Sequence, residues 1–399
     1  MDVTLMREDA FDRTTRLIDA HGPRLAGTKA CLDTADALHE ELDAFADRAH
    51  KEDFIVRKGA FLGWIRLLVV AYAAGVAFIW LDMPWIAFAL ALASMVVLVL
   101  QFFLYLPLLD GFYPKKTARN VYGVLEPTGD VKRQIIVSGH HDSAHVFNFF
   151  IHQPKLYNLR VNGSIVFVLT LVIVAMASAV ATMPTWALWT TRGIITAGLL
   201  LVGQMWFFVS KQATPGAGDN LIASAIALTL GKHFKGLRDK GEGLKHTRLI
   251  VASFDAEEEG LRGARAFVKR HVKMLKAAPT TVLNMDCLYD AKELFFLTSD
   301  LNGFVPLDKP LAVSLTKTAD TLGIKVKTQP LAFLTGGTDA AEFAKKSVSA
   351  TTLIGMPWTN QARSLDYHTP SDTIDKVSPK VVEATLRIFE RHIIESDRK

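Results

Sequence analysis

Five short segments of the sequence carry closely spaced histidines and carboxylates, the side chains that a site for two metal ions needs. None of the five contains a cysteine. Imidazole nitrogens and carboxylate oxygens bind first-row metal ions such as zinc. In chain order the segments are Gly139-His140-His141-Asp142-Ser143, Gly216-Ala217-Gly218-Asp219-Asn220, Ala256-Glu257-Glu258-Glu259-Gly260-Leu261, Asn284-Met285-Asp286 and Tyr367-His368-Thr369-Pro370.

These residues could supply both ligand sets of a two-metal hydrolase. Two metal ions about 3.5 to 4 Å apart polarise a scissile carbonyl and acidify a bridging water. A carboxylate must bridge the ions, and a separate base must accept the proton. His140 and Asp286 can bind one ion. Glu258 and His368 can bind the other, and Asp219 can bridge the two.

Two further carboxylates suit supporting roles in catalysis. Glu257 is adjacent to a ligand and can act as the general base. Asp142 follows His140 by two residues in an extended segment, so it returns to the same side and can orient that imidazole. A single His-x-Asp or Glu-Glu pair is usually surface or turn chemistry, but five motifs in this order favour a catalytic site.

With these motifs, the sequence resembles zinc metallopeptidase family 28, the aminopeptidase Y type of co-catalytic di-zinc exopeptidases. The resemblance extends to Gly22-Pro23-Arg24-Leu25-Ala26-Gly27 and to His368-Thr369-Pro370-Ser371-Asp372-Thr373. It implies two Zn²⁺ ions, although the same ligands also suit Mn²⁺ or Co²⁺. Carried over position by position, it implies metal ligands at His140, Asp219, Glu258, Asp286 and His368 and the base at Glu257.

The sequence departs from the family pattern in two places. Residues 143–218 replace a short connection and contain a long apolar insertion, and Thr338-Asp339-Ala340 stands where the family often has Ser-Asp-His. Glutaminyl cyclases share the fold with one metal but lack the full ligand set, which makes cyclisation a weaker alternative. Tyr289 and Tyr367 are both candidates to stabilise the oxyanion, and the sequence does not choose between them.

The remaining histidines and cysteines have simpler interpretations. We interpret His141, His145 and His152 as local polar contacts rather than as a third metal site, although His145 could line the pocket. Cys287 is interpreted as a small buried residue beside Asp286. Cys31 and Cys287 are far apart and in no metal-binding or redox spacing, so no disulfide framework is indicated.

The elements that must position the motifs follow an α/β pattern. We predict a β-hairpin around Pro127-Thr128-Gly129-Asp130, and further apolar strands that alternate with helical stretches. This alternation predicts a mostly parallel mixed sheet with helices on both faces. The predicted helices cover residues 7–20 and 32–45, and the predicted strands cover 54–56, 120–125, 134–137, 249–254, 282–284 and 352–354.

The motifs follow the predicted strands, as ligand sites of open α/β sheets do. His140, Glu257 and Asp286 each come at or just after the end of an apolar strand. If the strand at 120–125 runs antiparallel to the strand at 134–138, its start lies at the same end of the sheet as His140. Both apolar insertions would then leave the sheet from the end that carries the motifs.

Half of the residues are hydrophobic, and the mean hydropathy is positive, which is unusual for a soluble chain of this length. Each apolar run is about 20 residues long, the length that spans a bilayer. We predict four transmembrane helices in two inserted hairpins, with tryptophans towards their ends. The runs cover residues 61–80, 85–106, 164–182 and 192–209.

The insertions divide the chain into one discontinuous peptidase domain and two hairpins. The peptidase domain covers residues 1–59, 114–162 and 211–399, and the hairpins cover 60–113 and 163–210. Basic residues flank the hairpins on the domain side, which predicts a multi-pass protein of the plasma or inner membrane with a cytoplasmic catalytic domain. The amino terminus lacks the apolar core of a signal peptide.

The expected partners are a peptide substrate and the lipid bilayer. The net charge is +5, but no basic run is interleaved with aromatic residues, so nucleic acid is not an expected partner. The sequence does not indicate an oligomeric state. Our first hypothesis is a membrane-anchored di-zinc aminopeptidase. The alternatives are a hydrolase of amphiphilic amides, such as acylated amino acids or lipopeptides, and a non-catalytic peptidase fold used for binding.

Overall fold

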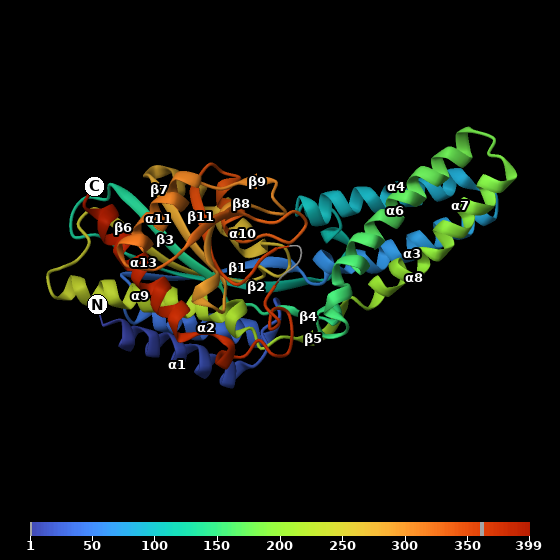
Figure 1. The fold of residues 1–399 in the computed structure, drawn as a ribbon. Coiled ribbons are helices and arrows are strands. Elements are labelled where there is room, and N and C mark those ends of the chain that lie inside the picture. Colours follow the sequence, from blue (N-terminus) through green and yellow to red (C-terminus); the bar gives the residue numbers. More distant parts are fainter. Residues whose placement is uncertain (1, 360–362) are drawn as a thin grey trace. The chain divides into compact units, whose positions relative to one another are not determined.

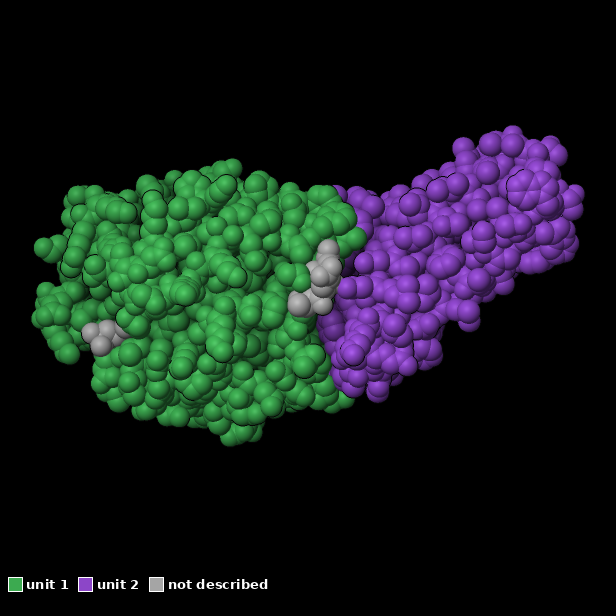
Figure 2. All heavy atoms as spheres, viewed as in Figure 1, with its two compact units in different colours: residues 1–58, 114–145, 212–399 green, residues 59–113, 146–211 purple. Residues whose placement is uncertain are grey.

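The computed structural model describes residues 2–359 and 363–399 (Figure 1). The chain forms two compact units (Figure 2). The sheet unit comprises residues 1–58, 114–145 and 212–399, and the helical unit comprises residues 59–113 and 146–211. The second part of the helical unit thus begins at residue 146 rather than at 163, because a short strand and two short helical turns precede its first long helix.

Within the described residues, the sheet unit contains a nine-stranded mixed sheet (Figure 1). Its strands are β1 (Arg48–Arg57), β2 (Lys115–Leu125), β3 (Arg133–His140), β6 (Thr247–Phe254), β7 (Thr280–Leu288), β8 (Leu294–Asp300), β9 (Val305–Pro306), β10 (Lys327–Pro330) and β11 (Ser349–Gly355). The order is β1-β2-β6-β3-β7-β11-β8-β10, with β9 paired to β8. The four central strands β6, β3, β7 and β11 are parallel to one another.

The predicted hairpin between residues 120–125 and 134–137 is wrong. β6 lies between β2 and β3, antiparallel to β2 and parallel to β3. The connection that was predicted as a tight turn instead bonds to the segment before β6, where Thr128 N donates to Leu244 O and Gly129 N donates to Lys245 O. β6 is almost entirely buried, and its place between two strands gives hydrogen-bond partners to the backbone groups on both of its edges.

Helices cover both faces of the sheet, which confirms the predicted fold class. α9 is buried along most of its length because it carries alanine, isoleucine and leucine towards β3 and β6. On the opposite face, Phe267 of α10 and Phe343 of α12 pack against Phe254 of β6. The helices are α1 (Val3–His21), α2 (Lys29–Asp43), α9 (Ile222–Asp239), α10 (Arg262–Ala277), α11 (Lys309–Thr321), α12 (Ala340–Ala344) and α13 (Pro379–Asp397).

The parallel strands bring their carboxyl ends to one edge of the sheet. His140, Phe254 and Leu288 are the last residues of β3, β6 and β7. β2 runs in the opposite direction, so its first residue, Lys115, lies at this edge, paired with Arg57 at the end of β1. The chain therefore leaves the sheet unit after β1 and re-enters it before β2 at the edge where the motif residues lie.

The helical unit contains helices long and apolar enough to cross a membrane. Four such segments occur among the described residues, at Ala60–Trp80, Pro84–Phe103, Pro154–Val180 and Thr185–Phe207. Their mutual packing includes Tyr72, whose hydroxyl donates to Ile195 O at 2.7 Å. The helices of this unit are α3 (Ala60–Trp80), α4 (Pro84–Val97), α5 (Asn148–Ile151), α6 (Tyr157–Val180), α7 (Thr185–Ala197) and α8 (Leu199–Val202). The short strands β4 (His145–Phe147) and β5 (Val209–Ala213) pair with each other and fall at the chain positions where the units change.

The fourth apolar segment begins seven residues before the predicted start at Arg192, at Thr185. Arg192 lies inside α7 and is buried rather than marking the end of a helix. Its guanidinium donates to Ile79 O and pairs with Asp82, and it lies over the ring of Trp80 at 5.3 Å. A charge satisfied in this way can stay within an apolar helix.

Candidate active site

His140 ends β3, and the close packing of α9 explains the glycine that precedes it. A Cβ atom at Gly139 would lie 2.6 Å from Cβ of Ala223 and 2.8 Å from the backbone nitrogen of Ser224. These separations are shorter than non-bonded atoms tolerate, so only glycine lets α9 approach this closely. The motif glycine thus places the start of α9, and the loop before it, beside His140.

Asp142 joins the end of β3 to the loop after β6. Its Oδ1 accepts a hydrogen bond from Glu257 N and its Oδ2 accepts one from Glu258 N, both at 3.1 Å. Oδ1 also lies 3.2 Å from Nδ1 of His140. The carboxylate therefore contacts the imidazole, as the sequence predicted, and in addition fixes the backbone of both glutamates.

Asp219 lies in the short helical turn at Ala217–Leu221 that leads into α9, and the Asp219–Asn220 peptide bond is cis. Asp372 holds this turn, because its carboxylate accepts hydrogen bonds from Gly218 N at 2.8 Å and Asp219 N at 3.3 Å. Asn220 Nδ2 donates to Met285 O at 2.9 Å, which joins the turn to β7. Asp219 is thereby fixed from two sides.

Asp286 and His368 complete the set of candidate metal ligands. Asp286 lies in β7, and His368 lies in a loop before α13. Asp286 follows Met285 near the end of β7, and it is buried. His368 has a positive φ of 53° in a loop that is closed by a hydrogen bond from Thr369 N to Asp366 O. The ring of Tyr367 lies against the His368 imidazole, with 4.0 Å between the centroids.

The side chains form two groups that share Asp219. Nε2 of His140 lies 3.4 Å from Asp219 Oδ1 and 3.7 Å from Asp286 Oδ1. Nε2 of His368 lies 3.2 Å from Asp219 Oδ2 and 3.4 Å from Glu258 Oε1. In each group the donor atoms lie within 4.8 Å of one another, so each could surround one cation. Asp219 offers one oxygen to each group, as a bridging carboxylate would.

The residues present fit two zinc ions. The buried atoms of these two groups that have no hydrogen-bond partner among residues 2–359 and 363–399 include His140 Nε2, Asp219 Oδ2 and Asp286 Oδ1. Buried polar atoms are normally satisfied, so such a cluster of unused lone pairs indicates a missing positive partner. The donors are nitrogen and oxygen only, which suits zinc and equally manganese or cobalt.

Glu257 lies beside both groups, with Oε2 3.8 Å from Nε2 of His140. It also forms a possible donor group with His140 and Glu258. Burial raises the pKa of Glu257 well above its usual range; His140 opposes this increase, and the neighbouring carboxylates, led by Asp286, add to it. The ionised form of Glu257 therefore depends strongly on positive charge nearby.

The ligand groups themselves have perturbed pKa values that reflect mutual charge. Burial lowers the pKa of His368, but the carboxylates of Glu258 and Asp219 raise it to about 9 overall. Burial raises the pKa of Glu258 to about 7 against the opposing effect of His368. Asp219 is buried as well, yet its contacts with His140 and His368 hold its pKa below the usual range. The site thus gathers several carboxylates whose ionised forms bound cations would stabilise.

Three supporting residues were not assigned a role from the sequence. Asp372 holds the backbone of Asp219, and Arg24 donates to backbone carbonyls on both sides of the site. Both lie in segments that carried the family resemblance, but their roles depend on contacts distant in sequence. Asp339 is buried, and neither of its carboxylate oxygens has a hydrogen-bond partner among the described residues. Burial raises the pKa of Asp339 well above its usual range, against the opposing effect of His140, and an ionised Asp339 in turn raises the pKa of Glu257.

The other residues singled out in the sequence lie around this centre or apart from it. Tyr289 packs against Gly218, where a Cβ atom would lie 2.3 Å from its ring. Cys287 is buried next to Asp286, and His152 is exposed. His141 is fully buried, and its Nδ1 lies 2.8 Å from Ser253 Oγ. Which tyrosine stabilises an oxyanion stays a prediction.

Comparison with known proteins places these residues in a peptidase context. A family described as peptidase family M28 matches residues 205–392. The matched segment includes Asp219, Glu257, Glu258, Asp286 and His368. His140 and Asp142 precede it. A probable glutamate carboxypeptidase of Arthroderma benhamiae is 39% identical over 71 residues, which cover 18% of this chain and 10% of that protein.

Solved structures share the fold at low sequence identity. A zinc aminopeptidase from Bacillus subtilis matches 98% of this chain and 95% of its own, with 15% identity and a TM-score of 0.56. A Zn-dependent exopeptidase from Parabacteroides distasonis matches 97% of both chains, with 13% identity and a TM-score of 0.57. A glutaminyl cyclase from Bacteroides thetaiotaomicron also matches 97% of both chains, with 11% identity and a TM-score of 0.57.

The family match supports a metal-dependent peptidase, and the solved structures show a fold that zinc exopeptidases share. The match of peptidase family M28 to residues 205–392 confirms the resemblance that the motifs indicated. The low identities to the solved structures establish the fold, and the same fold carries both peptidases and cyclases.

Proposed function

We propose that the protein is a membrane-anchored di-zinc aminopeptidase that removes amino-terminal residues from peptides. The observation that carries this proposal is the pair of donor groups that share Asp219, with Glu257 beside them. When bound, two zinc ions would polarise the scissile carbonyl and lower the pKa of the attacking water. His140, Asp219 and Asp286 would hold one ion, and His368, Glu258 and Asp219 the other.

Glu257 is the proposed general base. It is adjacent in sequence to a ligand, its backbone is fixed by Asp142, and its carboxylate faces the His140 group. A base must be within hydrogen-bond reach of the proton that it accepts. From this position Glu257 would take a proton from the water and return it to the departing amine.

Asp339 favours an aminopeptidase over a carboxypeptidase. A free peptide amino group is a cation at neutral pH, and a buried carboxylate without a hydrogen-bond partner is a suitable acceptor for it. A carboxypeptidase would instead need a cation for the terminal carboxylate of its substrate. The carboxypeptidase relative covers only 18% of this chain, so its name does not outweigh the charge of the site.

A hydrolase of amphiphilic amides is the second candidate. The apolar helices and the site belong to one chain, and the chain passes out of the sheet unit at the edge that carries the site. Acylated amino acids or lipopeptides partition into bilayers, so such an enzyme would meet them there. Rates on matched free and acylated aminoacyl reporters, measured in detergent and in liposomes, distinguish this candidate from the first.

The proposed location is the plasma or inner membrane, with the catalytic domain in the cytoplasm. Four apolar helices of spanning length support integral insertion. Lys58, Lys115, Lys155 and Lys211 flank these helices close to the points where the chain meets the sheet unit. Excess basic residues near helix ends favour the cytoplasmic side.

Replacing Glu257 tests the catalytic assignment. Glu257→Gln keeps the shape of the side chain but cannot accept the proton, so kcat for an aminoacyl reporter should fall by about 100-fold or more. Zinc content, measured by mass spectrometry, should stay at the wild-type level. Glu259→Gln, in the same run of glutamates but in neither donor group, should retain most of the turnover. Full activity of Glu257→Gln would remove the base assignment.

A further inference from the structure

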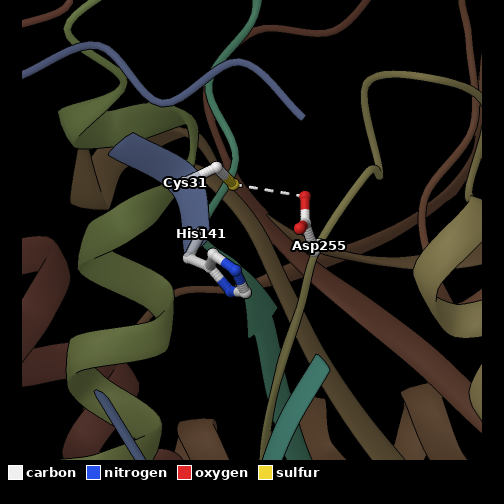
Figure 3. Close-up of side chains that lie close together, drawn as sticks. All are labelled: Cys31, His141 and Asp255. Atoms are coloured by element: carbon white, nitrogen blue, oxygen red, sulfur yellow. Dashed lines mark hydrogen bonds between the residues drawn. The ribbon is translucent and has the colours of Figure 1, made fainter. Parts of the chain in front are cut away.

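A second cluster of metal-ligating side chains lies behind the end of β3. Cys31 comes from the first turns of α2, His141 directly follows β3, and Asp255 directly follows β6. All three are fully buried, at 0% exposure. Figure 3 shows the thiol, the imidazole and the carboxylate gathered around one space, and their donor atoms lie within 4.8 Å of one another.

In this cluster the thiol of Cys31 and one carboxylate oxygen of Asp255 contact each other, and one nitrogen of His141 has no hydrogen-bond partner among the described residues. Asp255 uses Oδ2 to accept a hydrogen bond from Arg119 N at 2.8 Å, and its Oδ1 accepts the Cys31 thiol at 3.2 Å. Nδ1 of His141 lies 2.8 Å from Ser253 Oγ. Nε2 of His141 is buried and has no hydrogen-bond partner among the residues that the structure describes. An imidazole nitrogen left unused in the interior indicates a ligand.

We propose that Cys31, His141 and Asp255 bind a third metal ion, of the zinc class, at a structural site separate from the two-metal centre. Thiolate, imidazole and carboxylate are zinc ligands at about 2.3, 2.0 to 2.1 and 2.0 to 2.2 Å. Donors that already lie within 4.8 Å of one another reach these distances by small side-chain movements. A water or a main-chain oxygen would supply the fourth ligand.

The charges of the cluster suit a divalent cation. A thiolate at Cys31 and a carboxylate at Asp255 together carry two negative charges, which one divalent ion balances in the interior. Asp142 adds negative charge nearby, whereas the guanidinium of Arg24 acts against a cation. That guanidinium is, however, occupied by hydrogen bonds to backbone carbonyls.

The site is distinct from the catalytic centre and would support it mechanically. None of its three residues belongs to the two groups that share Asp219. Successive residues of an extended segment face opposite sides, so His140 and His141 can serve different ions. A metal here would join α2 to the segments after β3 and β6, which continue into Asp142 and Glu257. The expectation that His141 makes only a local polar contact would then be too narrow.

Cobalt substitution of the full-length protein in detergent tests the proposal without reference to activity. Cobalt bound to a thiolate gives an intense near-ultraviolet charge-transfer band, which a site of histidines and carboxylates cannot give. After removal of metals and titration with Co²⁺, we expect three equivalents of bound cobalt and this band. Cys31→Ser should abolish the band and reduce the bound cobalt to two equivalents.

Two further variants keep the test independent of folding defects in Cys31→Ser. Cys287→Ser removes the other cysteine and should leave the band unchanged. Asp255→Asn keeps the thiol but weakens the ligand set, so the third equivalent should bind more weakly than in the wild type. Binding of two equivalents without a band, or a band that persists in Cys31→Ser, would overturn the proposal. A failure here would leave the two-metal centre and its proposed activity untouched.

Discussion

Arg24 shows how one residue can order a site without touching it. The side chain is fully buried and donates to the carbonyl oxygens of His141 at 2.9 Å, Pro215 at 3.0 Å and Gly216 at 2.7 Å. These carbonyls belong to the segment after His140 and to the segment before Asp219. The guanidinium therefore fixes the distance between two proposed metal-binding segments, and five donors in one plane suit this role better than an ammonium group does.

Replacing Arg24 by lysine should weaken both folding and metal binding. A lysine has a single nitrogen, so several buried carbonyls would lose their donor, and the free energy of unfolding should fall by about 2–5 kcal/mol. Zinc should also dissociate at lower chelator concentrations. Thermal unfolding and chelator titration measure the two effects. Arg16→Lys, at a surface ion pair, is the control, and equal behaviour of the two variants would contradict the role of Arg24.

At the residue scale, the motifs predicted which side chains the structure brings together. The seven residues chosen for the site come from five segments, and their types and order were sufficient to group them. Asp339, Asp372 and Cys31 were not assigned because each acts through contacts with residues far away in the sequence. Spacing cannot reveal a carboxylate that lacks a partner, since this depends on the packing of several segments.

At the scale of elements, the sheet shows the limit of local patterns. Turn residues at 127–130 indicated a hairpin, but β6 pairs with both of the strands that the hairpin was to join. Such a non-local pairing is favoured by burial of an apolar strand on both edges, which a turn signal does not report. The orientation of β2 relative to His140 was nevertheless predicted correctly, because β2 is antiparallel to β6 and β6 is parallel to β3.

His392, a buried residue of α13, makes the free energy of unfolding depend on pH. This side chain is 6% exposed, and burial lowers its pKa to about 4, assisted by the charge of Lys399. Between pH 6.5 and pH 4 the unfolded chain binds a proton that the folded chain does not, so stability falls as the pH falls. The pKa shift corresponds to about 3 kcal/mol across this window.

His392→Gln should therefore lose less stability than the wild type on acidification. We expect the difference between the unfolding midpoints at pH 7 and pH 4.5 to be smaller in this variant. Scanning calorimetry or intrinsic fluorescence provides the midpoints. His152→Gln, at an exposed position, should behave as the wild type does. An identical pH dependence of His392→Gln and the wild type would show that His392 does not contribute.

At the scale of the whole molecule, the proposed function requires that the helical unit spans a bilayer. Among the described residues, the predicted and found apolar segments agree in number, but the third begins at Pro154 rather than at 164 and the fourth at Thr185 rather than at 192. Arg192 lies inside the fourth segment, buried by contacts within the unit. Composition identifies long apolar runs, but it cannot show that an arginine inside one of them has partners. Both native cysteines are buried, which allows single cysteines to report on the two sides of the membrane.

Cysteines introduced at Thr182 and Lys399 should differ in their access to an impermeant maleimide. Thr182 lies in the connection between α6 and α7, and Lys399 is the last residue of the chain described. In intact cells, Thr182→Cys should be labelled and Lys399→Cys should not, and both should be labelled after permeabilisation. The opposite pattern would reverse the proposed orientation. Release of the protein from membranes by alkaline carbonate would contradict integral insertion.

The central claim is that the two groups sharing Asp219 hold the metals of an aminopeptidase. The most direct measurement is mass spectrometry of a peptide library incubated with the zinc-loaded protein, with each peptide present in amino-free and amino-acetylated forms. The expected result is stepwise loss of amino-terminal residues from the amino-free peptides alone, which chelation abolishes and Zn²⁺ restores. Release from the carboxyl terminus, preference for the acylated forms, or cyclisation without hydrolysis would contradict it.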